Sequence, residues 1–335
     1  MFRDRADYNG AMNDSTRRVA IIGAGISGMT CAARLQSAGF EVSVFEKSRG
    51  AGGRITTRRR DRERFDHGAQ FFTARTPQFL AMVTEWAAQG IVAPWLGRFG
   101  DWRDQSFFEG VSRHERWVGT PRMSSLGRHL AKDLSVHLQT KVVEIVRRVD
   151  VWCLKVESGD SFTGFDVVLL CCPGPQAVAL LPKESGLISV ARRLEYSPCW
   201  VAMLSYSDPL SVPFDGLRLD HPVLSWAARD SSKPGRTPGE RWVLHASPSW
   251  SAAHLEQSPD YVSQHLVGEW SMIVPGHPTD VSTHRWRYSL AMETEGALAH
   301  YDSVSGLGLC GDAFVGPRIE DAWRSGTALA DRILS

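Results

Sequence analysis

The residues near the start of the chain whose spacing suits chemistry are three glycines and one acid. Gly23, Gly25 and Gly28 stand in a GxGxxG pattern, and Glu46 follows them. The first glycine of such a pattern permits a tight turn, the second lets the backbone approach a pyrophosphate, and the third lets a helix pack on a strand. The carboxylate of Glu46 can accept hydrogen bonds from ribose hydroxyls. Together the four residues predict a dinucleotide site.

The elements around these residues occur in the order that such a site requires. Residues 19 to 54 read as an apolar strand, a glycine turn, an amphipathic helix, a second strand that ends in Glu46, and a second glycine-rich turn. The N-terminus of the helix offers free N–H groups and partial positive charge to a phosphate. A GxGxxG pattern alone is weak evidence, but here strand, glycines, helix and acid all follow in order.

The second turn, GAGGR at residues 50 to 54, indicates which dinucleotide is bound. Flavin enzymes use a turn at this place, and nicotinamide enzymes have no need of one. The guanidinium of Arg54 could neutralise the FAD pyrophosphate with two parallel donors, a task for which lysine is a poor substitute. The alternative is a flexible loop, and this segment alone leaves both open. The arginine-rich run beyond it is expected on a solvated strand face and comprises Arg58, Arg59, Arg60, Arg62 and Arg64.

The C-terminal segment, residues 306 to 334, favours FAD. It reads as a short strand that ends at Gly311 and Asp312, a loop, and an amphipathic helix. Gly311 could admit the cofactor closely, and Asp312 could accept a hydrogen bond from a ribityl hydroxyl. The N-terminus of the helix, from Ile319 to Asp321, would aim its positive end at the pyrimidine edge of the flavin. These residues predict a redox-active flavin.

The remaining patterns predict an α/β fold with an FAD-binding, Rossmann-like (doubly wound βαβ) domain and an inserted substrate domain with a mixed or antiparallel sheet. We assign residues 17–75, 110–172 and 290–335 to the FAD-binding domain, and residues 76–109 and 173–289 to the substrate domain. Residues 142–146 and 149–156 read as a strand pair, and residues 166–173 as a buried parallel strand. Residues 1–16 are polar and irregular, and they are expected to form a mobile tail.

His245 lies in a stretch with strand alternation. Val243, His245 and Ser247 share one side, while Trp242 and its alternate neighbours face the other way. His245 could therefore face a pocket. An isolated strand histidine is more often simply hydrogen-bonded in place, so the pattern alone leaves both roles open.

At this point the chain resembles a family, the renalase-like flavoproteins, within the group that shares the FAD domain of the flavin amine oxidases and p-hydroxybenzoate hydroxylase. The resemblance spans residues 19 to 334. Besides the glycine motifs it rests on FDHGAQFFTAR at 65–75, RWVGTPRMSSL at 116–126, LSWAARDSSKP at 224–234, WVLHAS at 242–247, HRWRY at 284–288 and CGDAFVGPRIEDAWRSG at 310–326. The first and last of these six indicate only FAD, and the middle ones are more specific.

The resemblance implies an FAD-dependent oxidase for mis-reduced isomers of NAD(P)H, which gives NAD(P)+ and, with molecular oxygen, hydrogen peroxide. It implies that His245 lies over the flavin ring with Asp230 as its partner, and that Gln70 and Phe71 touch the flavin. Two positions depart from the family pattern, which carries an amide at Asp230 and often a tyrosine at Phe71. A carboxylate at residue 230 could change which molecule is accepted, or stabilise a cationic amine.

The candidate sites are therefore as follows. The catalytic residues are His245 and Asp230, and no metal is expected. The substrate pocket is formed by Phe71, Trp226, Arg229, Trp286 and Tyr288, and the cations Arg229, Lys233, Arg285 and Arg287 could bind the diphosphate of a dinucleotide. Non-covalent FAD is held by Gly23, Gly25, Ser27, Gly28, Glu46, Lys47, Gly53, Arg54, Gln70, Phe71, Val143, Gly311, Asp312, Ile319 and Glu320.

Three other functions stay open. An amine oxidase would need an aromatic cage and a suitable charge, which Trp286 and Asp230 could supply. A desaturase or isomerase for a natural product would need a long apolar tunnel, which Phe71, Phe72 and Trp102 do not establish. In a third alternative, FAD would be only a scaffold and no reaction would occur.

Bulk composition fits a soluble enzyme. The chain has 335 residues, 43% hydrophobic content and a net charge of +1, which gives no reason to expect binding to nucleic acid or acidic lipid. Nothing resembles a signal peptide or a membrane span, so we expect a cytoplasmic protein. The six cysteines contain no CxxC pair, and we expect them to be reduced. The sequence does not indicate an oligomeric state and is compatible with a monomer.

Overall fold

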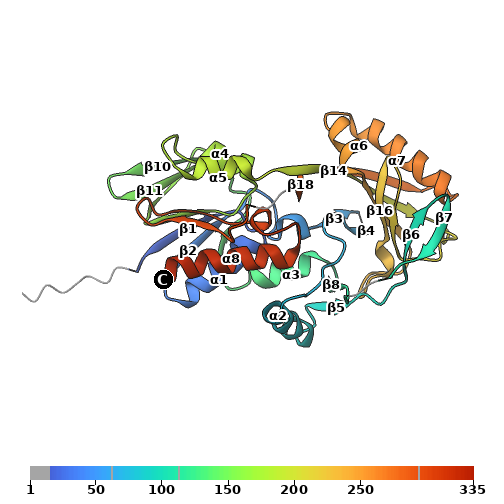
Figure 1. Cartoon of the computed structure of the whole chain (residues 1–335), viewed down its shortest axis with the longest axis horizontal. Coiled ribbons are helices and arrows are strands. Elements are labelled where there is room, and N and C mark those ends of the chain that lie inside the picture. The colour runs from blue at the N-terminus through green and yellow to red at the C-terminus, as the bar shows by residue number, and fades with distance from the viewer. Residues whose placement is uncertain (1–15, 62, 112–113, 293–294) are drawn as a thin grey trace, which may run out of the picture.

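The computed structural model describes residues 16–61, 63–111, 114–292 and 295–335. The predicted N-terminal tail therefore lies outside the described residues except for residue 16. The described chain forms two lobes (Figure 1). The lobe at the left of the figure contains the first strand and the C-terminal helix, and the long strands β14 (Tyr196–Tyr206) and β18 (Asp280–Ala291) run from it into the lobe at the right.

The first lobe is built on a six-stranded sheet in the order β19-β20-β13-β1-β2-β9. Strand β1 pairs in parallel with β2 and β13, β13 with β20, and β2 with β9, whereas β19 is antiparallel. The sheet confirms the predicted Rossmann-like fold. Its strands are β1 (Arg18–Ile22), β2 (Glu41–Phe45), β9 (Ser135–His137), β13 (Val167–Leu170), β19 (His300–Asp302) and β20 (Leu307–Leu309).

Helices cover one face of this sheet because the strands alternate apolar side chains between two cores. Val19 and Ile21 pack under α1 (Ile26–Ser37) and α8 (Ile319–Leu334), while Ala20 and Ile22 face the opposite core. The two helices touch closely, since a Cβ on Gly326 would lie 2.2 Å from the carbonyl oxygen of Ser27. This contact places the middle of α8 against the start of α1, and the two helices lie side by side in Figure 1.

The opposite face is covered by a three-stranded antiparallel sheet and two short helices. The strand pair predicted at residues 142–156 is present and gains a third strand, and all three share a core with α4 and α5. Ala177 and Val190 of those helices pack with β1 and β13, so the first lobe extends past the boundary predicted at residue 173. These elements are β10 (Val142–Arg148), β11 (Val151–Val156), β12 (Ser161–Phe165), α4 (Gly174–Leu180) and α5 (Leu187–Arg193).

The second lobe is a seven-stranded sheet in the order β18-β14-β17-β16-β15-β6-β7, antiparallel except between β15 and β6. Trp242 and Leu244 of β17 face a core with Trp270 of α7, so His245 faces away from that core, as the alternation predicts. The further elements of this lobe are β6 (Phe99–Arg103), β7 (Ser106–Glu109), β15 (Gly216–Leu219), β16 (Leu224–Arg229), β17 (Glu240–Ala246), α6 (Pro248–Ala253) and α7 (Pro259–Ile273).

Small elements join the two lobes. They are β3 (Thr57–Arg60), β4 (Glu63–Asp66), α2 (Pro77–Ala88), β5 (Val92–Pro94), β8 (Trp117–Gly119) and α3 (Ser124–Leu130), with single 3-10 turns at Gly53–Ile55, Asp230–Ser232 and Asp312–Phe314. No helix within the described ranges is long and apolar enough to cross a membrane.

Candidate active site

A cavity of about 1570 Å³ lies where the two lobes meet. Its lining runs from the glycine turn of the first lobe to β16, β17 and β18 of the second. Most small-molecule pockets measure roughly 300–1,000 Å³, so this cavity has room for more than one drug-sized molecule. The space suits a long cofactor together with a substrate.

The glycine turn has the geometry that a dinucleotide needs. Gly23 adopts a φ of 111°, which disfavours residues with a side chain, and a Cβ on Gly28 would lie 2.1 Å from the carbonyl oxygen of Gly23. A Cβ on Gly25 would meet nothing within 4 Å, although this residue lines the cavity. The backbone at Gly25 is therefore open to a bound group, and the residues present fit a pyrophosphate.

Glu46 lies buried at the end of β2 and lines the cavity. Its carboxylate accepts hydrogen bonds from the backbone N–H of Ala24 at 2.9 Å and of Ser48 at 2.8 Å. These bonds hold the first glycine turn and the segment after β2 against the strand end, and the N–H of Gly52 in the second turn donates to the carbonyl of Ala24 at 2.8 Å. Other residues proposed for FAD also line this cavity, namely Ser27, Lys47, Gly53, Val143, Gly311 and Ile319.

Arg54 and Asp312, predicted to bind different parts of FAD, also bind each other. Arg54 donates from both terminal nitrogens to the two carboxylate oxygens of Asp312, at 2.7 Å each, and also to the backbone carbonyl of Ser289 at 2.9 Å. Burial alone would lower the pKa of Arg54, but the Asp312 carboxylate raises it above its usual value. The pair joins the GAGGR turn to the C-terminal segment, although the two residues are 258 positions apart in the sequence.

The side chains at the second-lobe end of the cavity form an aromatic slot. Phe71 packs against Trp226 with ring centroids 5.6 Å apart, and the indole of Trp286 donates to the carbonyl of His67 at 3.0 Å. Gln70, Phe71, Trp226, His245, Trp286 and Tyr288 all line the cavity. The structure therefore brings the predicted flavin-contacting and pocket residues together, apart from those described below.

His245 is held in a fixed orientation and stays neutral. Its Nε2 lies 3.3 Å from Nε2 of Gln70, and its ring is also hydrogen-bonded to the backbone of His67. Burial, and then the charge of Lys233, lower the pKa of His245 to about 4. Two further histidines that line the cavity, His67 and His284, have pKa values of about 3 and 4, mainly because of burial. The histidines in this cavity are therefore uncharged at neutral pH.

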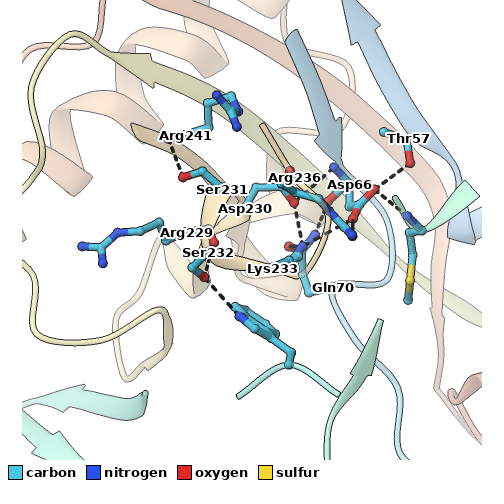
Figure 2. Close-up of polar contacts among 12 residues, drawn as sticks. Thr57, Asp66, Gln70, Arg229, Asp230, Ser231, Ser232, Lys233, Arg236 and Arg241 are labelled. Carbon is cyan, nitrogen blue, oxygen red and sulfur yellow. Dashed lines mark hydrogen bonds and ion pairs between the residues drawn. The ribbon is translucent and has the colours of Figure 1, made fainter. Parts of the chain in front are cut away.

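Gln70 contacts a buried network of charged side chains, which Figure 2 shows. Lys233 donates to Oε1 of Gln70 at 3.0 Å and to Asp230 at 2.7 Å, and its Nζ lies 3.8 Å from Asp66. Arg236 donates to Asp66 as well. Burial alone would raise the pKa of Asp66, but Lys233 and Arg236 hold it below its usual value. Two cations thus face two carboxylates in a region closed to water.

Asp230 has a different place from the one predicted. Of the residues that the structure describes, the cavity lining includes His245 but not Asp230, and the neighbour at hydrogen-bonding distance from the imidazole Nε2 is Gln70. Burial raises the pKa of Asp230, and the hydrogen bond from Lys233 opposes that shift. The prediction of Asp230 as the partner of His245 is therefore wrong, because the 3-10 turn at residues 230–232 directs its carboxylate to Lys233.

Two more predicted residues lie away from the described lining of the cavity. Arg229 pairs with Asp215 at 3.1 Å and Glu240 at 3.2 Å, and its guanidinium lies over the ring of Trp242 on the far face of the sheet. Glu320 is buried and accepts hydrogen bonds from the backbone N–H groups of residues 75 and 76, which lead into α2. Both are used for structural contacts because alternation or helical rotation turns them from the cavity.

Of the four cations proposed for a diphosphate, Arg285 and Arg287 line the cavity, while Arg229 and Lys233 belong to other contacts. Sequence reasoning missed Glu256, which accepts hydrogen bonds from both arginines. It also missed the role of Lys233 under Gln70. The only sequence signal for the second was the closeness of Lys233 to Asp230, since the partner Asp66 is far away in the chain.

Known proteins agree with this architecture. A family model for NAD(P)-binding Rossmann-like domains matches residues 21–86, and one for flavin-containing amine oxidoreductases matches residues 87–334. A crystal structure from Exiguobacterium sp. 255-15, assigned as a protoporphyrinogen oxidase, superposes with a TM-score of 0.76 at 16% identity, covering 95% of this chain and 99% of that one. A putrescine oxidase bound to putrescine superposes with a TM-score of 0.70 at 12% identity and the same coverage.

Two curated relatives match this chain over a short stretch. Phytoene desaturase of Fusarium fujikuroi is 46% identical over 57 residues, which is 17% of this chain and 10% of the relative. The 4,4'-diapophytoene desaturase of Staphylococcus aureus (strain Newman) is 45% identical over 51 residues, 15% of this chain and 10% of the relative. The second family model, in contrast, covers most of the chain. The glycine turn, the Arg54–Asp312 ion pair and this match lead to one conclusion: the chain belongs to the flavin-containing amine oxidoreductases, and its cofactor is FAD.

Proposed function

We propose that the enzyme oxidises mis-reduced isomers of NAD(P)H, which carry the extra hydride at ring position 2 or 6, to NAD(P)+, while molecular oxygen is reduced to hydrogen peroxide. The reaction balances as dihydro-NAD(P), oxygen and one proton giving NAD(P)+ and hydrogen peroxide. FAD, held non-covalently, would supply the hydride acceptor and the route of the electrons to oxygen. This is the activity of the renalase-like enzymes that the motifs resemble.

The observation that carries the proposal is that Arg285 and Arg287 line the same cavity as His245 and Trp226. A substrate with an uncharged planar ring and a diphosphate suits such a cavity, because the aromatic slot accepts the ring and the guanidinium forks accept phosphate oxygens. His245, held by Gln70 and the His67 backbone, supplies a fixed and uncharged wall that orients the ring. Such orientation accounts for much of the rate of a transfer between stacked rings.

The alternative substrate, a cationic amine, is less well supported. It would meet the two arginines, and the carboxylate expected to attract it, Asp230, is paired with Lys233 outside the described lining. A desaturase function draws support from the curated relatives, but the shared stretch is only 15–17% of this chain. Neither alternative gives Arg285 and Arg287 a ligand.

The test is anaerobic mixing of the yellow holoenzyme with borohydride-treated NAD, which contains the wrong isomers, and separately with pure NADH and with putrescine. We expect the first to bleach the flavin absorbance band rapidly, and the other two to leave it intact. Bleaching by putrescine, or by none of the three, would refute the proposal. Acid precipitation should release the flavin into the supernatant if it is held non-covalently, and fractionation of cells should recover the enzyme from the cytoplasm.

A further inference from the structure

A smaller groove of about 360 Å³ adjoins the main cavity. Two residues, His284 and Arg285, line both spaces, so the two are neighbours. The groove volume lies within the range of small-molecule sites. Its remaining walls are Trp200, Glu256, Gln257, Pro259 and Thr283.

Two guanidinium groups and one carboxylate stand at this junction. Arg287 donates to Glu256 at 2.6 and 2.9 Å, and Arg285 donates to Glu256 at 2.8 Å. Arg285 and Arg287 are two residues apart on β18, so both project to the same side of the strand. Their side chains are 32% and 44% exposed, and that of Glu256 is 67% exposed, so the group can be reached from solvent.

The charges at this junction are unequal. Two positive groups share one negative group, and the charge of Arg58 also acts on His284 beside them. Exposed ion pairs are weak, so the Glu256 carboxylate can be displaced. A diphosphate carries more negative charge than one carboxylate and offers more acceptor oxygens to the two forks. The geometry around Glu256 therefore resembles a phosphate site that a carboxylate from the same chain fills.

We propose that this groove is a subsite for the adenosine diphosphate half of the dinucleotide substrate, with its diphosphate taking the place of the Glu256 carboxylate on Arg285 and Arg287. The inference rests on the proposed function and adds the groove, the two arginines and the competing carboxylate to it. The main cavity would then hold the reacting ring, and Trp200 and Pro259 would supply apolar walls for the distal half of the substrate.

The experiment compares two substrates that share the reacting ring. Borohydride-treated NAD carries the diphosphate, and borohydride-treated nicotinamide riboside has none. The measured quantity is the concentration that gives half-maximal rate of flavin reduction, expressed as the ratio of riboside to dinucleotide, for the holoenzyme and for Arg287→Gln, Glu256→Gln and a control, Arg98→Gln. Arg98 makes an exposed ion pair with Glu109 and lies outside the described lining of both spaces.

We expect Arg287→Gln to lower this ratio about tenfold, because the dinucleotide loses a charge-assisted contact, and Glu256→Gln to raise it several-fold because the competitor is neutralised. Arg98→Gln should leave the ratio unchanged. If the native enzyme is reduced by the dinucleotide but neither variant changes the ratio, the groove is not the subsite while the proposed function stands. If the native enzyme is reduced by neither compound, the proposed function fails and this inference fails with it.

Discussion

The ammonium group of Lys233 donates a hydrogen bond to Oε1 of Gln70 at 3.0 Å and thereby fixes the amide that lies against His245. Because Oε1 faces a cation, the amide nitrogen must face the other way. There it donates to the backbone carbonyls of Asp66 and Gly68 and approaches the imidazole. A charged group that has no place in the described cavity lining thus determines the orientation of two side chains that do line it.

Replacing Lys233 by methionine is expected to destabilise the protein by about 3–5 kcal/mol, since two buried carboxylates would then share one cation. The double variant Lys233→Met with Asp230→Asn restores charge balance and should recover most of that loss. The measurement is the free energy of unfolding in urea. Lys155→Met, which removes an exposed ion pair with Glu144, serves as the control and should change it little. A double variant as unstable as the single one would contradict this account.

The acid sensitivity of the protein should follow from its buried histidines. The pKa of His245 is about 4 in the folded chain, against about 6.5 when unfolded, so the unfolded state binds more protons between these values. Stability is therefore lost as the pH falls from about 6.5 towards 4. By pH 5 the titration of His245 has lowered the free energy of unfolding by about 2 kcal/mol. Urea unfolding at pH 7 and pH 5 should show a smaller acid loss for His245→Asn than for the native protein, and an equal loss would contradict the assignment.

The same histidine should affect the reaction without affecting cofactor binding. His245→Ala removes a fixed wall of the slot, so we expect slower flavin reduction by the wrong NAD isomers in anaerobic stopped-flow traces, with the bound flavin spectrum retained. The native rate should show no transition near pH 6.5, because the imidazole is already neutral there. An unchanged reduction rate in the variant would remove His245 from the catalytic residues.

The nucleotide lobe was predictable from sequence because its signals are local. Gly23, Gly25, Gly28 and Glu46 lie within one βαβ unit, and the strict alternation around His245 placed its side chain correctly. The errors arose where a side chain had to be assigned to one of two environments. Glu320 directly follows the lining residue Ile319, and Arg229 stands three residues after the lining residue Trp226 on β16, but each side chain is directed to a partner outside the described lining.

Contacts between distant segments were not predictable. The partner of Lys233 at Asp66 and the partner of Arg285 at Glu256 depend on how whole lobes and loops come together, and no period in the sequence encodes them. The resemblance to a family supplied Asp230 as a site residue, but it carried over the role of an amide to a carboxylate. The charge of that carboxylate made Lys233 a better partner than His245.

Arg54 should be needed for FAD affinity because its planar guanidinium fixes Asp312, the residue predicted to bind the ribityl chain. Arg54→Lys keeps the charge opposite Asp312 but cannot make two parallel hydrogen bonds, so we expect FAD affinity to fall about tenfold or more. Titration of the apoprotein with FAD, followed by quenching of flavin fluorescence, measures the change. Arg60→Lys is the matched control. Arg60 makes a partly exposed ion pair with Asp280 of β18 and is not among the described lining residues of the cavity. Equal affinities in the two variants would contradict the role of Arg54.

Two alanine substitutions in the glycine turn should have different effects, one on FAD binding and the other on the stability of the protein. A Cβ on Gly25 meets nothing in the protein, so Gly25→Ala should fold with nearly native stability yet lose FAD, because the methyl group occupies the space of the pyrophosphate. A Cβ on Gly28 would lie 2.1 Å from the carbonyl of Gly23, so Gly28→Ala should destabilise the first lobe itself. Thermal unfolding of the apoproteins separates the two cases, and the visible absorbance of the purified proteins reports the cofactor. A Gly25→Ala protein that retained full flavin absorbance would show that the cofactor does not approach this turn.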